Sequence, residues 1–341
     1  MKTVFIQESD IKSMNWSRSL FKYGVNSVPI SKDRTVLLFT VLWYWITGHT
    51  PQALIFRYLN DYESLFKTLV QLTLEVVIVY FCKITGIEML WICHNIKASS
   101  VKNHKRIVQY RKRLMLRSCE KVLFTHKCFV EVGCRNLRID RNRADWTCFG
   151  KLDMASGRLD QNVIRALSFT RTVYDSRSAC IGIWPGHLEE KNLTSFRLAI
   201  NLSKCERRIA ILVVGDLDYL DKSTKRRISS MTNVLLIDDF VNLHDRLLEN
   251  VDFFVKGTND LSIPLTLFHA MSAEKPLVVP SSSYLSKIVN SYNIGASTSA
   301  SDPECKKVLN LVRNWDASNS KNFLETYSWE VGAKKISECV G

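Results

Sequence analysis

The sequence predicts an α/β protein with two doubly wound domains that face a cleft. Three observations lead to this fold class. The chain has 341 residues, which suits two domains of roughly 150 residues each. Short apolar runs alternate with amphipathic segments, as in parallel sheets covered by helices. A polar stretch of mixed charge at 135–172 interrupts this alternation, and we place the connection between the domains there.

The first half contains the predicted N-terminal domain, residues 1–165, and each of its elements has a local signal. Short apolar runs predict strands at 2–7, 35–42, 52–59, 88–93 and 121–126. Amphipathic segments predict helices at 15–24, 62–84 and 101–118. We expect Asn15 to be the N-cap of the first helix and Gly24 to end it, and Gly86 to end the second.

The second half repeats the alternation more regularly and forms the predicted C-terminal domain, residues 173–320. Strands are expected at 179–184, 208–215, 233–240, 252–257 and 276–280. Each is followed by a helical segment, at 193–205, 221–230, 243–251, 262–274 and 283–293. The last residues, 321–341, are expected to form a final helix; the family resemblance given below implies that this helix crosses back to the first domain.

Composition limits the kinds of partner. The net charge of +14 and the pI of about 9.3 indicate an anionic partner: nucleic acid, nucleotide phosphates or an acidic membrane surface. None of the ten cysteines forms a C-x-x-C pair, which argues against zinc sites and thioredoxin-like chemistry. Reduced thiols in a cytoplasmic compartment are the expectation.

Two apolar stretches bear on membrane association. Residues 35–48 are too short to span a bilayer. In 65–86, Lys67, Gln71 and Glu75 recur at spacing four and form a polar stripe, which indicates a helix packed against other protein. The N-terminus lacks the apolar core of a signal peptide. We therefore expect no transmembrane helix, while peripheral association with the inner membrane face stays open.

Two segments lie where ligands bind in such sheets. His94 and Asn95 directly follow the strand at 88–93, at the carboxyl edge of the sheet. The helix expected to open near Ser262 has Pro264 in its first turn, and a helix N-terminus suits phosphate. An ordinary loop cap and an ordinary capped helix are the alternatives.

The order and spacing of several segments resemble the donor domain of GT-B glycosyltransferases. These segments include "IGIWPGHLEEKN", "ILVVGD", "NVLLIDDFV" and "HAMSAEKPLVVP". "EMLWICHNI" is similar to the His-Asn loop of the acceptor domain, and "FLETYSWE" to the closing segment. The likeness starts near residue 50 and points to the family that builds polysaccharides and lipid-linked glycans. It implies two Rossmann-like domains and a nucleotide-sugar substrate. No acidic metal-binding motif stands out in the sequence, so we expect no metal and no cofactor.

The resemblance transfers to individual donor-binding residues. Lys191 matches the lysine that faces the donor diphosphate, and Gly182 precedes the position of a companion arginine, which is Ile183 here. The amides of Ser262 and Ile263 are expected to bind the diphosphate.

Three family glutamates are replaced, by Leu261, His269 and Lys287. Without them the sugar and the stereochemical outcome stay open, and Asp260 is our candidate for the missing carboxylate.

His94 has two readings in this context. It either only caps its loop, or it faces the cleft and donates a hydrogen bond to the donor sugar or phosphate while Asn95 supports the loop. An imidazole can also act as a base near neutral pH, but the sequence does not establish that role.

The helix at 101–118 has seven cations and no acid before Glu120. They include Lys105, Arg106, Arg111, Lys112 and Arg113. This surface is either simply solvated or docks anionic lipid headgroups or a lipid-linked diphosphate acceptor. The aromatic cluster at 42–48 is either core or an interfacial anchor.

Three functions follow as hypotheses. The first is a hexosyltransferase-type, metal-independent glycosyltransferase that moves a sugar from a nucleotide-sugar to a glycan or lipid-linked acceptor at the membrane surface. The second is a non-catalytic GT-B-like partner subunit, which the missing arginine and glutamates favour. The third, nucleic-acid binding, lacks any recognisable motif.

Overall fold

The computed structural model describes residues 1–59, 62–94, 96, 103–177, 180–239, 241 and 243–341. The chain divides into two compact units. Unit 1 comprises Met1–Gly150, Leu261–Ile263 and Tyr327–Gly341, and unit 2 comprises Lys151–Asp260 and Pro264–Thr326. The sequence-based boundary at 165–173 therefore falls inside helix α6 (Gln161–Arg177), which belongs to unit 2.

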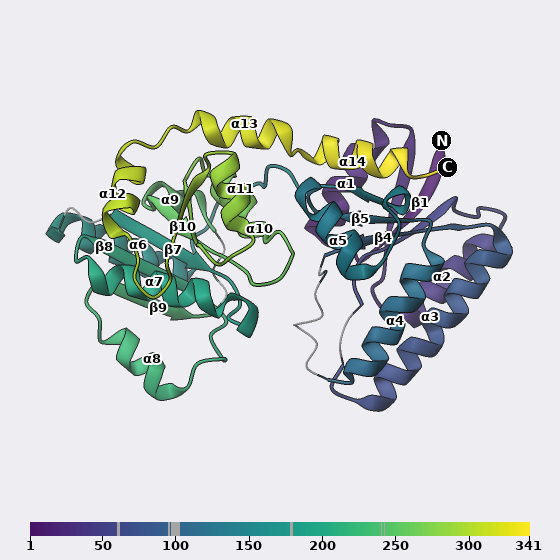
Figure 1. Ribbon diagram of the computed structural model, residues 1–341, viewed down its shortest axis with the longest axis horizontal. Helices are drawn as coiled ribbons and strands as arrows, with labels where there is room; N and C mark the ends of the chain where they lie inside the picture. Colours follow the sequence, from purple (N-terminus) through teal and green to yellow (C-terminus); the bar gives the residue numbers. More distant parts are fainter. Residues whose placement is uncertain (60–61, 95, 97–102, 178–179, 240, 242) are drawn as a thin grey trace. The chain divides into compact units, whose positions relative to one another are not determined.

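Unit 1 contains a parallel six-stranded sheet in the order β2-β1-β3-β4-β5-β6 (Figure 1). Its strands are β1 (Lys2–Gln7), β2 (Val25–Ile30), β3 (Ala53–Phe56), β4 (Glu88–Cys93), β5 (Lys121–Phe124) and β6 (Ala144–Trp146). Its helices are α1 (Ile11–Phe21), α2 (Arg34–Ile46), α3 (Leu65–Thr85), α4 (Lys105–Ser118), α5 (Val130–Leu137) and α14 (Trp329–Glu338). The buried strands β3 and β4 pair in register from Ala53↔Glu88 to Phe56↔Trp91.

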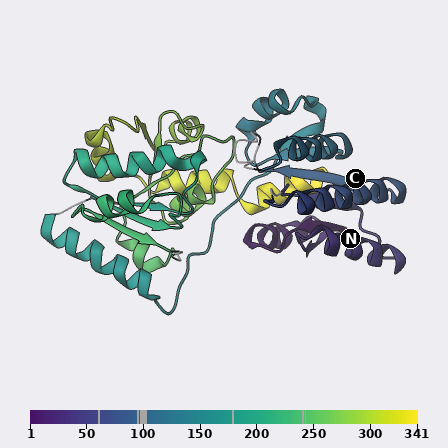
Figure 2. The same cartoon turned by 90° about the horizontal axis from the view of Figure 1, so that it is seen from below.

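Unit 2 contains a second parallel six-stranded sheet, in the order β12-β11-β10-β7-β8-β9, with helices on both faces (Figures 1 and 2). Its strands are β7 (Cys180–Pro185), β8 (Ile209–Gly215), β9 (Val234–Asp238), β10 (Phe253–Val255), β11 (Leu277–Pro280) and β12 (Gly295–Thr298). Its helices are α6, α7 (Leu193–Cys205), α8 (Lys222–Ser229), α9 (Asp245–Glu249), α10 (Leu265–Ser272), α11 (Leu285–Ser291), α12 (Cys305–Arg313) and α13 (Ser318–Thr326). The prediction of two doubly wound, Rossmann-like α/β domains is confirmed.

Residues 35–42 form a helix, α2, so their assignment as a strand was wrong. Asp33 caps α2 by accepting hydrogen bonds from the amides of Thr35 and Val36. The inward residues Leu37 and Val41 are fully buried at helical spacing. The helical period was hidden in the sequence because the outward face of α2 is apolar as well.

Two further local features of unit 1 differ from the prediction. Helix α1 begins after Asp10 and not at Asn15, because the Asp10 carboxylate and Ser13 form a reciprocal capping box. Strand β2 was missed, since "VNSVPI" is weakly apolar and contains Pro29. It lies at the edge of the sheet, where proline is tolerated.

Helix α3 is confirmed and ends at Gly86 in the left-handed conformation. Among the described residues, α3 is the one helix with the length and hydropathy to span a membrane. It nevertheless connects β3 to its neighbour β4 in one sheet, and it buries Glu75 completely. Both observations indicate a crossover helix that packs on protein along one face.

Candidate functional site

The strand order of unit 2 fixes where a ligand site is expected. Its first strand, β7, lies between β10 and β8, so the chain direction across the sheet reverses between β7 and β10. In open α/β sheets, ligands bind beyond the carboxyl ends of the strands at this switch point.

Gly186 and Lys191 lie at the switch point of unit 2. Gly186 follows β7 with a φ of +119°, and a Cβ on neighbouring Gly215 would come within 1.9 Å of the Gly186 carbonyl oxygen. Lys191 pairs with Glu189 at 2.6 Å, and its side chain is 32% exposed. The amide of Asn259, in the loop after β10, donates to the Lys191 carbonyl at 2.8 Å. The predicted diphosphate lysine is thus held, partly exposed, beside both strand ends.

Lys256, the residue directly after β10, was missed by the sequence analysis. Its side chain is buried, and its Nζ donates to the Pro185 carbonyl at 2.6 Å and lies 4.0 Å from the ring centre of Trp184. Burial, together with the charge of Lys191, lowers the pKa of Lys256 to about 7. The signal in the sequence was a lysine at the end of an apolar strand, in "DFFVKG".

Gly182 does not lie at the site. It is in the middle of β7, where a Cβ would come within 2.4 Å of the Phe253 ring. Its smallness serves packing between strands, so its assignment as a donor-binding residue was wrong.

Ser262 and Ile263 precede the helix that they were expected to open. Helix α10 starts at Leu265, after Pro264, so the free amides of its first turn begin at Leu265. The prediction that Ser262 and Ile263 offer helix N-terminal amides is therefore wrong.

Asp260 and His269, the two polar candidates around α10, are both largely buried. The carboxyl group of Asp260 is completely buried, and its amide donates to Thr258 Oγ1 at 3.1 Å. Burial lowers the pKa of His269 to about 4, so His269 is neutral at physiological pH.

An acidic cluster that the sequence analysis did not find lies beyond β8 and β9. Carboxylate oxygens of Asp216, Asp218 and Asp238 lie within 4.8 Å of one another, and all three residues are exposed. His187 Nδ1 lies 2.7 Å from Asp216, and Lys225 pairs with Asp238. Because these carboxylates are exposed and both Asp218 and Asp238 already face Lys225, the cluster alone does not define a metal site.

In unit 1, the predicted His94 lies at the carboxyl edge of the sheet in an aromatic sandwich. Its ring stacks on Tyr58 at 4.7 Å and on Phe149 at 5.9 Å between centroids. Burial, then the charges of Lys12 and Arg57, hold the pKa of His94 well below its usual value. Its Nε2 is buried and has no hydrogen-bond partner among the described residues. His94 is therefore a neutral hydrogen-bonding group; Asn95 lies outside the described residues.

Two cations that the sequence analysis missed flank His94. Arg57 follows β3 and makes a bidentate pair with Asp10 at 2.7 and 2.9 Å. Lys12 Nζ donates to the Tyr58 hydroxyl at 2.9 Å. Burial and the charge of Arg57 lower the pKa of Lys12 to about 8. Asp10 pairs with Arg57, and the charges of Asp10 and Glu8 both act on Lys12, so the two cations at this edge face two carboxylates.

Helix α4 presents only part of the predicted cationic surface. Arg111 is completely buried and pairs with Glu75 of α3, so its assignment to the surface was wrong. Lys112 donates to the Ile96 carbonyl at 2.6 Å. Lys105, Arg106 and Arg113 are exposed.

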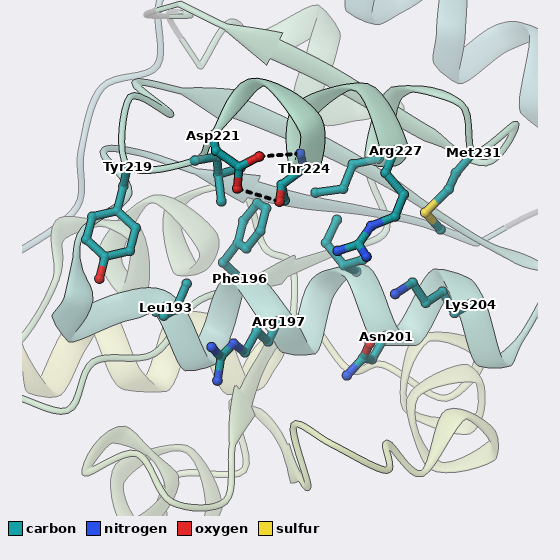
Figure 3. A pocket seen from close by; sticks show the side chains of 13 residues that line it. Leu193, Phe196, Arg197, Asn201, Lys204, Tyr219, Asp221, Thr224, Arg227 and Met231 are labelled. Carbon is teal, nitrogen blue, oxygen red and sulfur yellow. Dashed lines mark hydrogen bonds between the residues drawn. The ribbon is translucent and has the colours of Figure 1, made fainter.

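A surface pocket of about 370 Å³ lies between α7 and α8, with Leu193 at one end of its lining and Lys204, in the last turn of α7, at the other (Figure 3). Its floor includes Phe196 and Ile228, and Arg197, Lys204 and Arg227 contribute cations. It was not anticipated from the sequence, and it provides matched control positions for the switch-point site.

A search of family models and a search of curated proteins by sequence found no match. Solved structures do match over nearly the whole chain. HepE of Anabaena, in complex with UDP-glucose, has a TM-score of 0.65 at 12% identity and covers 99% of this chain and 98% of its own. WaaG, a glycosyltransferase of lipopolysaccharide biosynthesis, has a TM-score of 0.60 at 10% identity, with coverage of 99% and 99%.

UDP-GlcNAc 2-epimerase from Neisseria meningitidis, bound to UDP-GlcNAc, has a TM-score of 0.54 at 12% identity, with coverage of 99% and 99%. The fold is therefore shared by proteins with more than one chemistry. The chain has the architecture of two Rossmann-like units and resembles the GT-B glycosyltransferases in its fold.

Proposed function

We propose that the protein is a glycosyltransferase that moves a hexose from a nucleotide-sugar donor to a glycan or lipid-linked acceptor. The observation that carries this proposal is the position of Lys191, partly exposed beside Gly186 at the switch point of unit 2. Ligands of doubly wound sheets bind at such a point, and the folds of HepE and WaaG support the choice of reaction.

The proposed chemistry is stabilisation of the departing nucleoside diphosphate. Lys191 can exchange its ion pair with Glu189 for one with the diphosphate, because both side chains are about one-third exposed. The amides that begin α10 add donors and the positive end of the helix dipole. Charge that develops on the leaving oxygen would meet these groups. Lysine and backbone donors supply the positive charge, so we propose neither a resident metal nor a cofactor.

We propose that the acceptor binds along the edge of unit 1 that carries His94. The His94 imidazole is neutral, and its Nε2 has no partner among the described residues, so it can form a hydrogen bond with a hydroxyl group of the acceptor. Lys12 and Arg57 would attract an acceptor phosphate. With its pKa held low, His94 is a weak base at neutral pH, and we propose a positioning role for it.

The test is nucleoside diphosphate release from UDP- and GDP-sugars, with and without a membrane lipid extract, by the wild type, Lys191→Ala and Lys204→Ala. Lys204 belongs to the α7–α8 pocket, so Lys204→Ala is the matched control. We expect the wild type to release nucleoside diphosphate from one donor only, and only when acceptor is present. The rate of release should fall at least tenfold in Lys191→Ala and stay unchanged in Lys204→Ala. Donor binding without release would favour the non-catalytic partner subunit, and a donor sugar inverted at one carbon would indicate an epimerase.

A further inference from the structure

Large apolar side chains are concentrated on the outside of two helices of unit 1. Among the described residues, 21 large apolar side chains are exposed, and 12 of them belong to α2 and α3. These helices together have 34 residues, 13 in α2 and 21 in α3. Single exposed apolar side chains are ordinary, but a contiguous patch marks an interaction surface.

The outward stripe of α2 consists of Val36, Phe39, Trp43 and Ile46, at spacings of three and four residues. Their exposed fractions are 50%, 66%, 65% and 70%. The stripe lies on the side of the helix opposite the buried residue Val41. Side chains on the core face already stabilise α2, so this stripe is available to a partner.

Helix α3 carries a second stripe, with Phe66 and Ile84 near its two ends, 76% and 82% exposed. Tyr80, 62% exposed, lies between them. The two helices lie side by side (Figure 1), and Trp45 of α2 contacts Phe81 of α3 edge-to-face at 5.6 Å. We call the outward stripes of α2 and α3 together the apolar face.

The exposed charges within α2 and α3 are positive, and the exposed carboxylates of Asp33 and Glu63 lie just before the two helices. The only carboxylate in the two helices is Glu75, which is completely buried. Lys67 and Lys83 of α3 are exposed. Helix α4, which packs against α3, has no acid and exposes Arg106 and Arg113. An apolar surface bordered by lysine and arginine matches the interfacial region of an anionic bilayer.

We propose that the apolar face docks the protein on an anionic lipid bilayer, with α2 and α3 lying on the surface and the cations of α4 facing the headgroups. Helix α3 does not span, because Arg34 and Arg111 hold its Glu75 at the centre of a three-helix contact. A second copy of the chain is a poorer occupant, since self-association would bring the same cations together. Membrane docking itself does not depend on the proposed function. Only the further conclusion that the acceptor is lipid-linked rests on it.

Co-sedimentation with vesicles tests the docking without requiring turnover. The vesicles are phosphatidylcholine alone or with 30% phosphatidylglycerol. We expect the wild type to bind the anionic vesicles and the double variant Trp43→Ser/Phe66→Ser to bind at least tenfold more weakly. The control Phe21→Ser/Tyr174→Ser removes two aromatic side chains that are each 64% exposed outside the face, and should bind as the wild type does. Arg106→Gln/Arg113→Gln should weaken binding to anionic vesicles and reduce its salt dependence.

Three results would overturn the proposal. One is absence of vesicle binding by the wild type, and another is equal binding by the wild type and Trp43→Ser/Phe66→Ser. The third is a dimer in sedimentation velocity that Trp43→Ser/Phe66→Ser abolishes while vesicle binding persists, which would assign the face to a second copy. Nucleotide binding, measured on the same variants, should not change, so failure of docking and failure of the proposed function remain distinguishable.

Discussion

Replacing Glu75 by Gln should destabilise unit 1 strongly. Glu75 Oε1 and Oε2 accept charged hydrogen bonds from Arg34 Nε at 2.9 Å and from Arg111 at 2.8 and 2.6 Å. The three side chains are 0%, 3% and 1% exposed. Removing one partner of a buried ion pair typically costs about 3–5 kcal/mol. We expect at least ~3 kcal/mol here, because two guanidinium groups would stay buried without their shared carboxylate.

The decrease in the free energy of unfolding is measured by urea titration, with fluorescence and circular dichroism as the signals. It is taken from the transition that belongs to unit 1. Glu120→Gln removes an exposed carboxylate and should change the unfolding free energy by less than ~0.5 kcal/mol. The triple variant Arg34→Met/Glu75→Leu/Arg111→Met should recover most of the loss, since apolar replacement of a whole buried network is often neutral. A Glu75→Gln protein within ~1 kcal/mol of the wild type would refute the reasoning.

Three further predictions concern the two sheet edges. Lys191→Ala should weaken nucleotide binding at least tenfold in calorimetry and change stability little, since the ion pair of Lys191 is partly exposed. Lys204→Ala should leave both binding and stability unchanged. Weaker binding in Lys204→Ala, with unchanged binding in Lys191→Ala, would move the site to the α7–α8 pocket. Lys256 has a pKa of about 7 in the folded protein, against 10.5 ordinarily. Between these pH values the unfolded chain binds more protons, so the free energy of unfolding rises from pH 7 to 10.5. Urea unfolding of Lys256→Met should lack this rise, and the same dependence on pH as in the wild type would contradict the burial of Lys256. His94 stays neutral in the folded protein, whereas in the unfolded chain it takes up a proton below about pH 6.5, so the free energy of unfolding falls as the pH drops below that value. In His94→Phe this fall should be smaller. The same dependence of stability on pH as in the wild type would argue against the buried imidazole.

The alternation of apolar and amphipathic segments was sufficient to predict both sheets and most of their helices. It missed the short or weakly apolar strands β2, β6 and β12, and it assigned α2 to the wrong type of element. Helix α2 read as a strand because its outward stripe, with Phe39 and Trp43, is as apolar as its buried side. The polar stripe of α3 correctly indicated packing on protein, since its Glu75 is buried.

The candidate sites were predictable only in part. Chain position placed His94 at a carboxyl strand edge, because parallel topology brings strand ends together, whereas Lys191 was assigned from the resemblance to GT-B glycosyltransferases. The partners of a side chain were not predictable from one sequence: Arg111 reads as one of seven similar cations in its helix, and only the fold reveals its pairing with Glu75. Gly182 was misread for the same reason, since the Phe253 ring that requires its smallness is distant in sequence.

The central claim is that the switch point of unit 2 binds the diphosphate of a nucleotide-sugar through Lys191. Its most direct test is the thermal unfolding midpoint of the wild type and of Lys191→Ala against UDP, GDP and their common sugar conjugates, because a ligand that binds the native state raises the midpoint by mass action. We predict a concentration-dependent rise with one nucleotide class, and in Lys191→Ala the same rise should require at least tenfold more ligand. No rise with any of these ligands in a well-folded wild type, or an equal rise in Lys191→Ala, would contradict the claim.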